Sequence, residues 1–250
     1  AALVSGSLNV AVTSPLSVAQ ANGHGASLAL FCGAQPSPTI YYLARPDSSL
    51  KPGTWQKVLR ELPGKSIGIA VVGGSGQLQI ESAFTQIKLS PTAANYVPIG
   101  VGPPAEAAFL AGDVDVLPIS FPQAQQLIAA HEAKLLTTVG GTLPSPTAYK
   151  EYNYGFASTK QWILSNRHAA SQFCAAIKDS ITFMGQAKNF KAVERVIATQ
   201  FSLTPAIATA GAKSVIPTFS TAISASSVNA ALGSATPPST LTYSDVVLKP

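Results

Sequence analysis

The sequence has 250 residues, of which 46% are hydrophobic and only 11% are charged, and its formal net charge is +5. This composition excludes an intrinsically disordered chain, because it offers enough apolar surface for one large or two small folded domains. The basic residues are scattered and form no dense run, so nucleic acid is not expected as a partner. No apolar run approaches the ~20 residues of a membrane-spanning helix, and no signal peptide is visible.

Two stretches of the chain resemble each other at an offset of 106 residues. Residues 3–10 read LVSGSLNV, and residues 109–116 read FLAGDVDV. Each combines the end of a helix, a glycine suited to the left-handed position after a helix (Gly6 and Gly112), and a short alternating strand. Because the first residues already resemble the end of a helix, we expect the chain to begin inside a domain.

The similarity between the two halves continues beyond these strands. Ser14 and Ser120 follow the two strands at the same offset, and the run Pro-Ser-Pro-Thr occurs at both residues 36–39 and residues 144–147. Matches in this order predict two lobes of similar build, each a βα sheet with helices on its faces. Two interpretations of Ser14 and Ser120 stay open, because each hydroxyl either caps a helix or faces a ligand.

Two β-rich segments are expected to cross between the lobes. They are residues 39–45, which read TIYYLAR, and residues 154–158, which read YGFAS. Tyr41 and Tyr154 lie on these segments, where each ring either packs in the core with a satisfied hydroxyl or lines a pocket. A long amphipathic helix is predicted after the second segment, starting near Trp162.

Residues 65–89 read as a strand, a glycine-rich turn and a helix. A strand buried on both faces is predicted from a nearly continuous β-branched run, formed by Ile67, Ile69, Val71 and Val72. The turn has the sequence Gly73-Gly74-Ser75-Gly76, and helical spacing begins at Gln77. Such a turn leaves free N–H groups at a helix N-terminus, pointing where an anion or a polar group can bind.

No sharper motif fits this turn. A P-loop requires a lysine after its last glycine, a dinucleotide fingerprint requires a third glycine where Gln79 stands, and a nucleophile elbow requires glycine where Gln77 stands. The plain alternative is a tight βα turn without a ligand, since glycine-rich βα turns are common.

Metal and catalytic chemistry find little support in the sequence. Cys32 and Cys174 have no metal-ligand spacing and are either buried free thiols or a disulfide. His24, His131 and His168 are expected to be solvated surface side chains rather than catalytic bases. No zinc motif occurs, so we expect neither a metal nor a cofactor.

The order and spacing of these features resemble a known family. The run L-x-S-G-x-L-x-V ending in Ser-Pro, the later G-K-x-I-G-I with its glycine and serine turn, and A-x-x-A-F-L-A-G-D-V-D-V are similar to the nitrate/sulfonate/taurine-type substrate-binding proteins of ABC importers, a group that includes binders of thiamine-pyrimidine precursors. The resemblance covers about residues 1–190. It implies an α/β, two-lobed periplasmic-binding-protein fold (type II) with two crossing hinge strands and the ligand between the lobes.

The resemblance also implies which residues contact a ligand. Ser14 and Pro15 match the strand-end turn of the first lobe, and Ser120 and Phe121 match the corresponding strand end of the second. The glycine turn of the second lobe corresponds to Gly74, Ser75, Gly76 and Gln77. No arginine or lysine falls at these positions, so an anionic head group would rest on backbone N–H groups and hydroxyls, and a weakly charged, partly apolar ligand fits equally well.

The expected lobe boundaries follow from the repeat and the crossing strands. Lobe 1 comprises residues 1–44 and 148–250, and lobe 2 comprises residues 45–147. Hinge motion is expected near residues 44–46 and 147–149. Family members normally begin with a strand, a helix and a second strand ahead of the segment that opens this sequence, so lobe 1 is expected to lack those elements.

The function implied by the resemblance is extracytoplasmic solute binding for an ABC importer, without enzymatic activity. The expected partners are a small-molecule solute and the membrane permease, and the protein is expected to be a monomer in the periplasm or outside the cell, free or lipid-anchored. Two alternatives stay open. One is an enzyme of the thiamine-pyrimidine synthesis type, whose cysteine cluster this sequence lacks, and the other is the ligand-sensing domain of a receptor.

Overall fold

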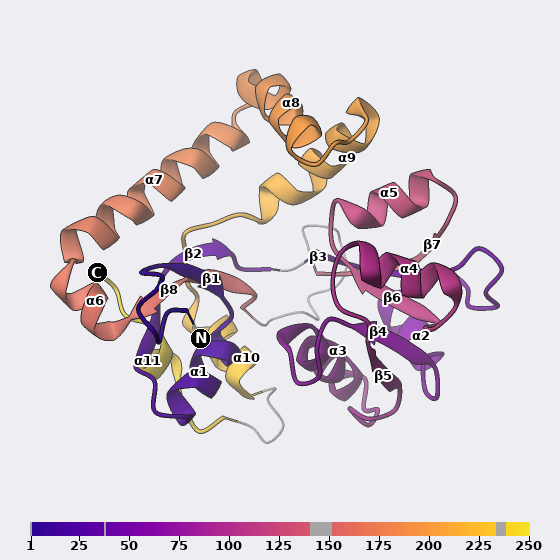
Figure 1. The fold of residues 1–250 in the computed structure, drawn as a ribbon, viewed down its shortest axis with the longest axis horizontal. Helices are drawn as coiled ribbons and strands as arrows, with labels where there is room; N and C mark the ends of the chain where they lie inside the picture. The colour runs from indigo at the N-terminus through magenta and orange to yellow at the C-terminus, as the bar shows by residue number, and fades with distance from the viewer. Residues whose placement is uncertain (1, 38, 141–151, 234–238) are drawn as a thin grey trace. The chain divides into compact units, whose positions relative to one another are not determined.

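The computed structural model describes residues 2–37, 39–140, 152–233 and 239–250 (Figure 1). The fold is α/β, and the chain divides into two compact units. Unit 1 comprises Ala1–Pro38, Lys150–Phe190 and Ile216–Pro250, whereas unit 2 comprises Thr39–Tyr149 and Lys191–Val215. Within the described residues, no helix is both long and apolar enough to cross a membrane.

The sheet of unit 1 has the strand order β1-β8-β2, and β8 is antiparallel to both neighbours. These strands are β1 (Ala11–Thr13), β2 (Leu28–Gln35) and β8 (Tyr154–Thr159). One face buries Leu30 and Ala157 against three helices, which are α1 (Pro15–Gly23), α10 (Ala225–Gly233) and α11 (Tyr243–Val246). The C-terminal segment then follows the edge of β2, where Leu248 N–H donates to the carbonyl of Leu30 at 2.9 Å.

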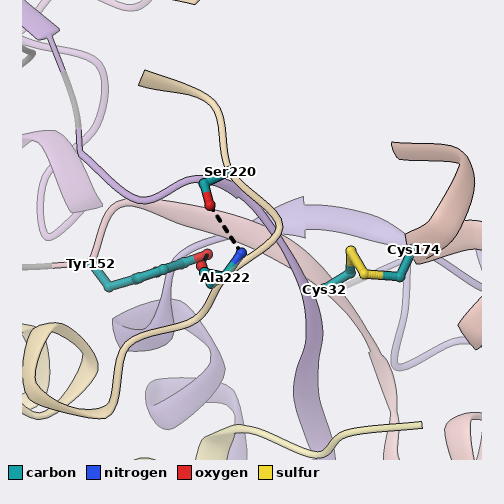
Figure 2. The surroundings of a disulfide bond; sticks show 5 residues. All are labelled: Cys32, Tyr152, Cys174, Ser220 and Ala222. Atoms are coloured by element: carbon teal, nitrogen blue, oxygen red, sulfur yellow. Dashed lines mark hydrogen bonds between the residues drawn. A yellow bond between two sulfur atoms is a disulfide. The ribbon is translucent and has the colours of Figure 1, made fainter. Parts of the chain in front are cut away.

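The opposite face of this sheet packs on α6 (Lys160–Ser165) and α7 (Arg167–Gly185). The pairing of β2 with β8 shifts register between Leu30 and Cys32. Such a bulge turns a strand locally, and here both Phe31 and Cys32 belong to the cluster that contains α7 residues. Cys32 forms a disulfide with Cys174 of α7 across 142 residues of sequence (Figure 2). The cysteines are therefore paired, which the sequence alone left open.

The segment after α9 (Pro205–Val215) lies against β2 in unit 1 (Figure 2). Gly33 N–H donates to the carbonyl of Thr221 at 3.0 Å, and the hydroxyl of Tyr152 donates to the carbonyl of Ala222 at 3.2 Å. A Cβ atom on Gly33 would lie 2.6 Å from the carbonyl oxygen of Ser220. Glycine is thus required at position 33 for this close backbone approach.

The sheet of unit 2 has five strands in the order β5-β4-β6-β3-β7. Strand β4 is parallel to β5 and β6, whereas β3 is antiparallel to β6 and β7. The strands are β3 (Thr39–Ala44), β4 (Ser66–Ile69), β5 (Asn95–Pro98), β6 (Val116–Ile119) and β7 (Lys134–Gly140). The helices between them are α2 (Trp55–Arg60), α3 (Ser75–Gln86), α4 (Pro103–Ala111) and α5 (Gln123–Ala129).

Alternating residues of β3 build the two cores of unit 2. Tyr42 belongs to the cluster that contains residues of α2 and α3, whereas Tyr41 and Leu43 belong to the cluster that contains residues of α4 and α5. This alternation is the period-two pattern of a strand buried on both faces. Helix α3 therefore covers one face of the sheet, and α4 and α5 cover the other.

Asp115 joins the beginnings of β4 and β6. Its Oδ2 atom accepts hydrogen bonds from the backbone N–H and the hydroxyl of Ser66, each at 2.9 Å. Burial alone would raise the pKa of this carboxyl, but the hydrogen bonds from Ser66, together with the charges of Lys65 and Arg45, hold it below its ordinary value. The ionised carboxylate thus keeps these neighbouring strands in register.

The units differ from the predicted lobes at two segments. Residues 39–44 were assigned to lobe 1, but they form β3, which pairs only with strands of unit 2 among the described residues. Residues 191–215 were also assigned to lobe 1, yet α8 (Phe190–Gln200) and α9 contribute to unit 2. The cause is long-range packing against α5, to which the local sequence gives no signal.

The hinge predicted at residues 44–46 stays a prediction. Arg45 lies inside unit 2, where its guanidinium donates to the carbonyls of Val114 at 2.7 Å and Phe109 at 3.3 Å. The chain passes from unit 1 to unit 2 at Pro38 and Thr39, at the other end of β3. The second predicted hinge, residues 147–149, lies outside the described residues, as does the repeated segment 144–147.

Two of the four residues that predicted the buried strand of residues 67–72 are not buried. Ile67 and Ile69 are in the core of unit 2, but β4 ends at Ile69. Val71 and Val72 lie in the following turn with 59% and 67% of their surface exposed. A β-branched run signals extended backbone and does not by itself specify burial.

The disulfide generates a prediction about stability. Closing a loop of this length restricts the unfolded chain, so replacing both cysteines with alanine should lower the free energy of unfolding by about 2–5 kcal/mol. Urea denaturation of the oxidised protein and the double variant measures this difference. Thiol titration of the unreduced, denatured protein should detect no free thiol, and two thiols per chain would contradict the pairing.

Candidate functional site

The carboxyl ends of three parallel strands meet at one edge of the unit 2 sheet. The chain runs from β4 to β5 on one side and then to β6 on the other side of β4. The helix after β4 covers one face of the sheet, and the helix after β6 covers the opposite face. The loops after β4 and β6 therefore diverge, which is the arrangement in which open α/β sheets bind ligands. We call this the switch-point edge.

The glycine turn lies at the switch-point edge and begins α3. Gly74 is the N-cap residue with φ −73° and ψ 161°, and no side chain caps the helix. The first N–H groups of a helix have no partner within the helix. The first turn of α3 also contains no acidic residue, so its positive dipole end is not neutralised locally. Backbone donors are thus directed at the space where the loops diverge.

Gln77 stabilises the turn from within the helix. Its Oε1 atom accepts the N–H of Gly73 at 2.8 Å, and its Nε2 atom donates to Oε1 of the buried Glu81 at 2.7 Å. Both ends of the amide are therefore engaged inside unit 2. The family resemblance predicts Gln77 as a ligand contact, and that contact stays a prediction beside its hydrogen bonds to the turn and to Glu81. The side chain of Ser75 lies outside the described part of the chain, so its predicted contact stays a prediction.

Ser120 follows β6 directly and is exposed at the same edge. Its carbonyl accepts the N–H of Ala124 at 3.2 Å, in the first turn of α5. Phe121, the next residue, turns inward, where its ring packs edge-on against Phe201 at a centroid distance of 6.1 Å. The structure therefore brings Ser120 and the glycine turn to one edge but packs Phe121 into unit 2.

Tyr41 reaches the switch-point edge through strand register. It pairs with Ile119, the last residue of β6, because β3 runs antiparallel to β6. The tyrosine is buried, and its hydroxyl donates to Oγ of Ser214 at 3.4 Å. The structure thus agrees with the packing interpretation, in which the ring of Tyr41 lies in the core and its hydroxyl is hydrogen-bonded.

The predicted residues of unit 1 also lie at one sheet edge. Thr13 pairs with Gly155, which brings Ser14 beside Tyr154. Ser14 is buried and caps α1 by accepting the N–H of Ser17 at 3.2 Å, and Pro15 occupies the first turn. Ser14 therefore caps α1, and its contact with a ligand stays a prediction. Tyr154 is partly buried and pairs with Gln35 of β2.

Sequence reasoning missed a polar network beside Tyr154. Gln35 donates from Nε2 to the hydroxyl of Thr218 at 2.9 Å, and Asn153 donates from Nδ2 to Oε1 of Gln35 at 3.4 Å. Asn153 and Thr218 are both buried. These partners are far apart in the sequence, so no local pattern signals the network.

Catalytic and metal-binding arrangements find no support in the described residues. His24, His131 and His168 are exposed. No group of three or more histidine, cysteine, aspartate or glutamate side chains gathers within the described ranges as metal ligands would. The polar groups at the switch-point edge are backbone donors and a hydroxyl, which suit reversible binding of a small polar or anionic group.

The model of the family described as NMT1/THI5 like matches residues 1–189. The chain belongs to this family. No curated protein matches the chain. The family assignment therefore rests on three quarters of the sequence, the part that contains every predicted site residue.

Solved structures similar to this NMT1/THI5-like protein confirm its periplasmic-binding-protein fold. A protein of Bordetella bronchiseptica RB50 has a TM-score of 0.79 at 16% identity, covering 99% of this chain and 80% of its own. The periplasmic aliphatic sulphonate-binding protein SsuA of Escherichia coli has a TM-score of 0.77 at 17% identity, covering 100% and 78%. The alkanesulfonate-binding protein SsuA of Xanthomonas axonopodis pv. citri, bound to MOPS, has a TM-score of 0.73 at 21% identity, covering 91% and 73%.

The two glycines of the turn should respond differently to alanine. At Gly74 an added Cβ atom would lie 2.8 Å from Cγ1 of Val71 and 3.1 Å from its carbonyl oxygen, so Gly74→Ala should destabilise the turn by about 1–3 kcal/mol. At Gly76 nothing lies within 4 Å of the added atom. Gly76→Ala should therefore stabilise the protein by up to about 1 kcal/mol, because alanine favours helix.

Urea denaturation of both variants beside the wild type measures these effects. Equal free energies of unfolding for the two variants would show that the turn does not have the backbone geometry described above.

Proposed function

We propose that this NMT1/THI5-like protein is the extracytoplasmic solute-binding protein of an ABC importer and binds a small polar or anionic organic solute. The observation that carries the proposal is the uncapped N-terminus of α3 at the switch-point edge, with Ser120 exposed at the same edge. Backbone N–H groups at a helix N-terminus bind anionic and polar groups without a cationic side chain. Family membership supports the same function.

The disulfide supports a location outside the cytoplasm. Structural disulfides persist in the periplasm and in extracellular space and are rare in reducing compartments. Cys32 and Cys174 join a buried strand to α7, a placement typical of a structural bridge rather than of a redox pair. One similar structure fits this location, because the SsuA protein of E. coli is described as periplasmic.

Sulfonates are the first class of solute that we propose. One relative is described as binding aliphatic sulphonates, and another was solved with MOPS, itself a sulfonate. The proposed contacts in unit 2 are the turn of Gly74, Ser75 and Gly76 together with Ser120. No lysine or arginine stands among them, so nitrate and uncharged pyrimidines are tested beside sulfonates.

The remaining predictions from the family resemblance become part of this proposal. Ser14, Pro15 and Tyr154 of unit 1 are proposed to contribute to the same ligand, with the two lobes closing over it through a hinge. A membrane permease is the proposed partner of the loaded protein, which acts as a monomer. An enzymatic role is not proposed, because the exposed histidines offer no organised general base.

A ligand screen tests this function. The protein is heated with taurine, methanesulfonate, MOPS, nitrate or a hydroxymethylpyrimidine, and the melting temperature is recorded. A ligand at 100 times its Kd should stabilise the native state by about 2.7 kcal/mol, and isothermal titration should give a Kd in the micromolar range, about −8 kcal/mol. Mass spectrometry after overnight incubation should recover the ligand unchanged.

Two results would contradict the proposal. Turnover of a panel member would indicate an enzyme, and the absence of any stabilisation across the panel would exclude these solute classes. Ser90→Ala, an exposed serine in the loop between α3 and β5, serves as a matched control for Ser120→Ala. Only the Ser120 variant should weaken binding.

A further inference from the structure

Helix α9 touches the ring of Phe121 at a glycine. A Cβ atom built on Gly211 would lie 1.8 Å from Cε2, 2.3 Å from Cζ and 2.5 Å from Cδ2 of Phe121. Real Cβ atoms do not approach other heavy atoms so closely, so the ring occupies the space that any other residue at position 211 would need. Gly211 is buried inside the helix, where glycine is less favourable than alanine. The close contact explains why glycine stands there.

The second contact of the Phe121 ring comes from the end of the neighbouring helix. Phe201 follows α8 and meets the ring at an interplanar angle of 77°. Helices α8 and α9 are joined to each other by a hydrogen bond of 2.7 Å from the hydroxyl of Thr209 to Oε1 of Glu194. The ring of Phe121 therefore contacts both members of one helical pair, α9 at Gly211 and the end of α8 at Phe201. We call this contact the Phe121 seat.

Helix α9 has a further connection to the same end of the sheet. Tyr41 donates its hydroxyl hydrogen to Oγ of Ser214, and that hydroxyl donates to the carbonyl of Gly211 at 2.9 Å. Tyr41 pairs with Ile119, the residue before Ser120. The Phe121 seat connects α9 to the residue after Ser120, and the hydrogen bonds through Ser214 connect α9 to Tyr41, which pairs with the residue before Ser120. Helix α9 is thus fixed against the end of β6 on both sides of Ser120 in the sequence.

We propose that Gly211 is a positioning residue for the ligand site: by seating Phe121 it holds the neighbouring hydroxyl of Ser120 at the switch-point edge. The inference rests on the proposed function, because Ser120 is there a ligand contact. Gly211 touches no ligand itself. It makes the α8–α9 pair part of the ligand-binding unit, although the sequence assigned these helices to the other lobe.

A double-mutant cycle tests the seat without any ligand. Gly211→Ala forces the ring out of its place and should lower the urea midpoint by roughly 1 M. Phe121→Leu removes Cε2 and Cζ, the two ring atoms that lie nearest the new methyl group, so the double variant should be more stable than the sum of the single changes predicts. Gly185→Ala is the control, because nothing lies within 4 Å of a Cβ atom at that position.

Two further readouts test the positioning role. In the amide spectrum of the unliganded protein, Gly211→Ala should shift the resonance of Ser120 and leave that of Gly76 in place. The Kd for the panel member that most stabilises the wild type should rise about tenfold in Gly211→Ala, as expected for misplacing one contact, and should partly recover in the double variant.

The measurements test the Phe121 seat, the positioning role of Gly211 and the proposed function separately. Equal urea midpoints for Gly211→Ala and the control would overturn the seat. A lowered midpoint with unchanged Ser120 resonance and unchanged Kd would overturn the positioning role and leave a packing contact only. If the wild type binds no panel member while Ser120 still shifts, the proposed function fails, and with it the ligand role of Ser120, but the seat stands.

Discussion

Strand β4 pairs in parallel with β5 on one side and with β6 on the other. The helix after β4 covers one face of the sheet and the helix after β6 covers the other, so the loops that follow these two neighbouring strands separate at the carboxyl ends of the strands. The glycine turn fills one of these loops, and Ser120 begins the other. The location of the proposed ligand contacts in unit 2 is therefore a consequence of strand order. Other features of unit 2 keep that order in place.

Three sets of interactions stabilise the sheet and its edge. At the amino ends of the strands, Asp115 and Ser66 exchange hydrogen bonds that join β4 to β6. Across the sheet, β3 places Tyr42 in one core and Tyr41 in the other, so a single strand couples the helices of both faces. At the carboxyl ends, Gln77 bonds Gly73 to the buried Glu81. The edge is thus built from preorganised backbone, which suits binding by N–H groups.

Local sequence signals predicted the parts of the site that depend on local structure. The cap at Ser14, the glycine turn before α3, and the left-handed Gly112 after α4 with φ 93° follow from residue preferences over a few positions. The α/β fold followed from the order of such signals and from the family resemblance. The end of β4 could not be predicted in this way, since Val71 and Val72 continue the β-branched pattern beyond Ile69, the last residue of the strand.

Contacts between distant parts of the chain could not be predicted in this way. The family resemblance predicts Phe121 as a ligand contact, and only the structure shows that its ring packs against Gly211 of α9. The assignment of residues 191–215 failed for the same reason, because α9 joins unit 2 through side chains that no periodicity reveals. The two hydrogen bonds from Arg45 to the carbonyls of Phe109 and Val114 inside unit 2 are likewise contacts between distant parts of the chain.

The most direct test of the central claim removes one backbone donor from the N-terminus of α3. Ser75→Pro deletes an N–H group at the first helical position, where proline is well tolerated, and the extended backbone of Gly74 suits the residue before proline. Ser75→Ala, which keeps the N–H group, is the matched control. With the solute identified by the screen, isothermal titration should show binding to the proline variant weakened by about 10- to 100-fold relative to the alanine variant, the loss expected for one hydrogen bond to a charged group. Equal affinities for a folded proline variant and the alanine variant would contradict the account.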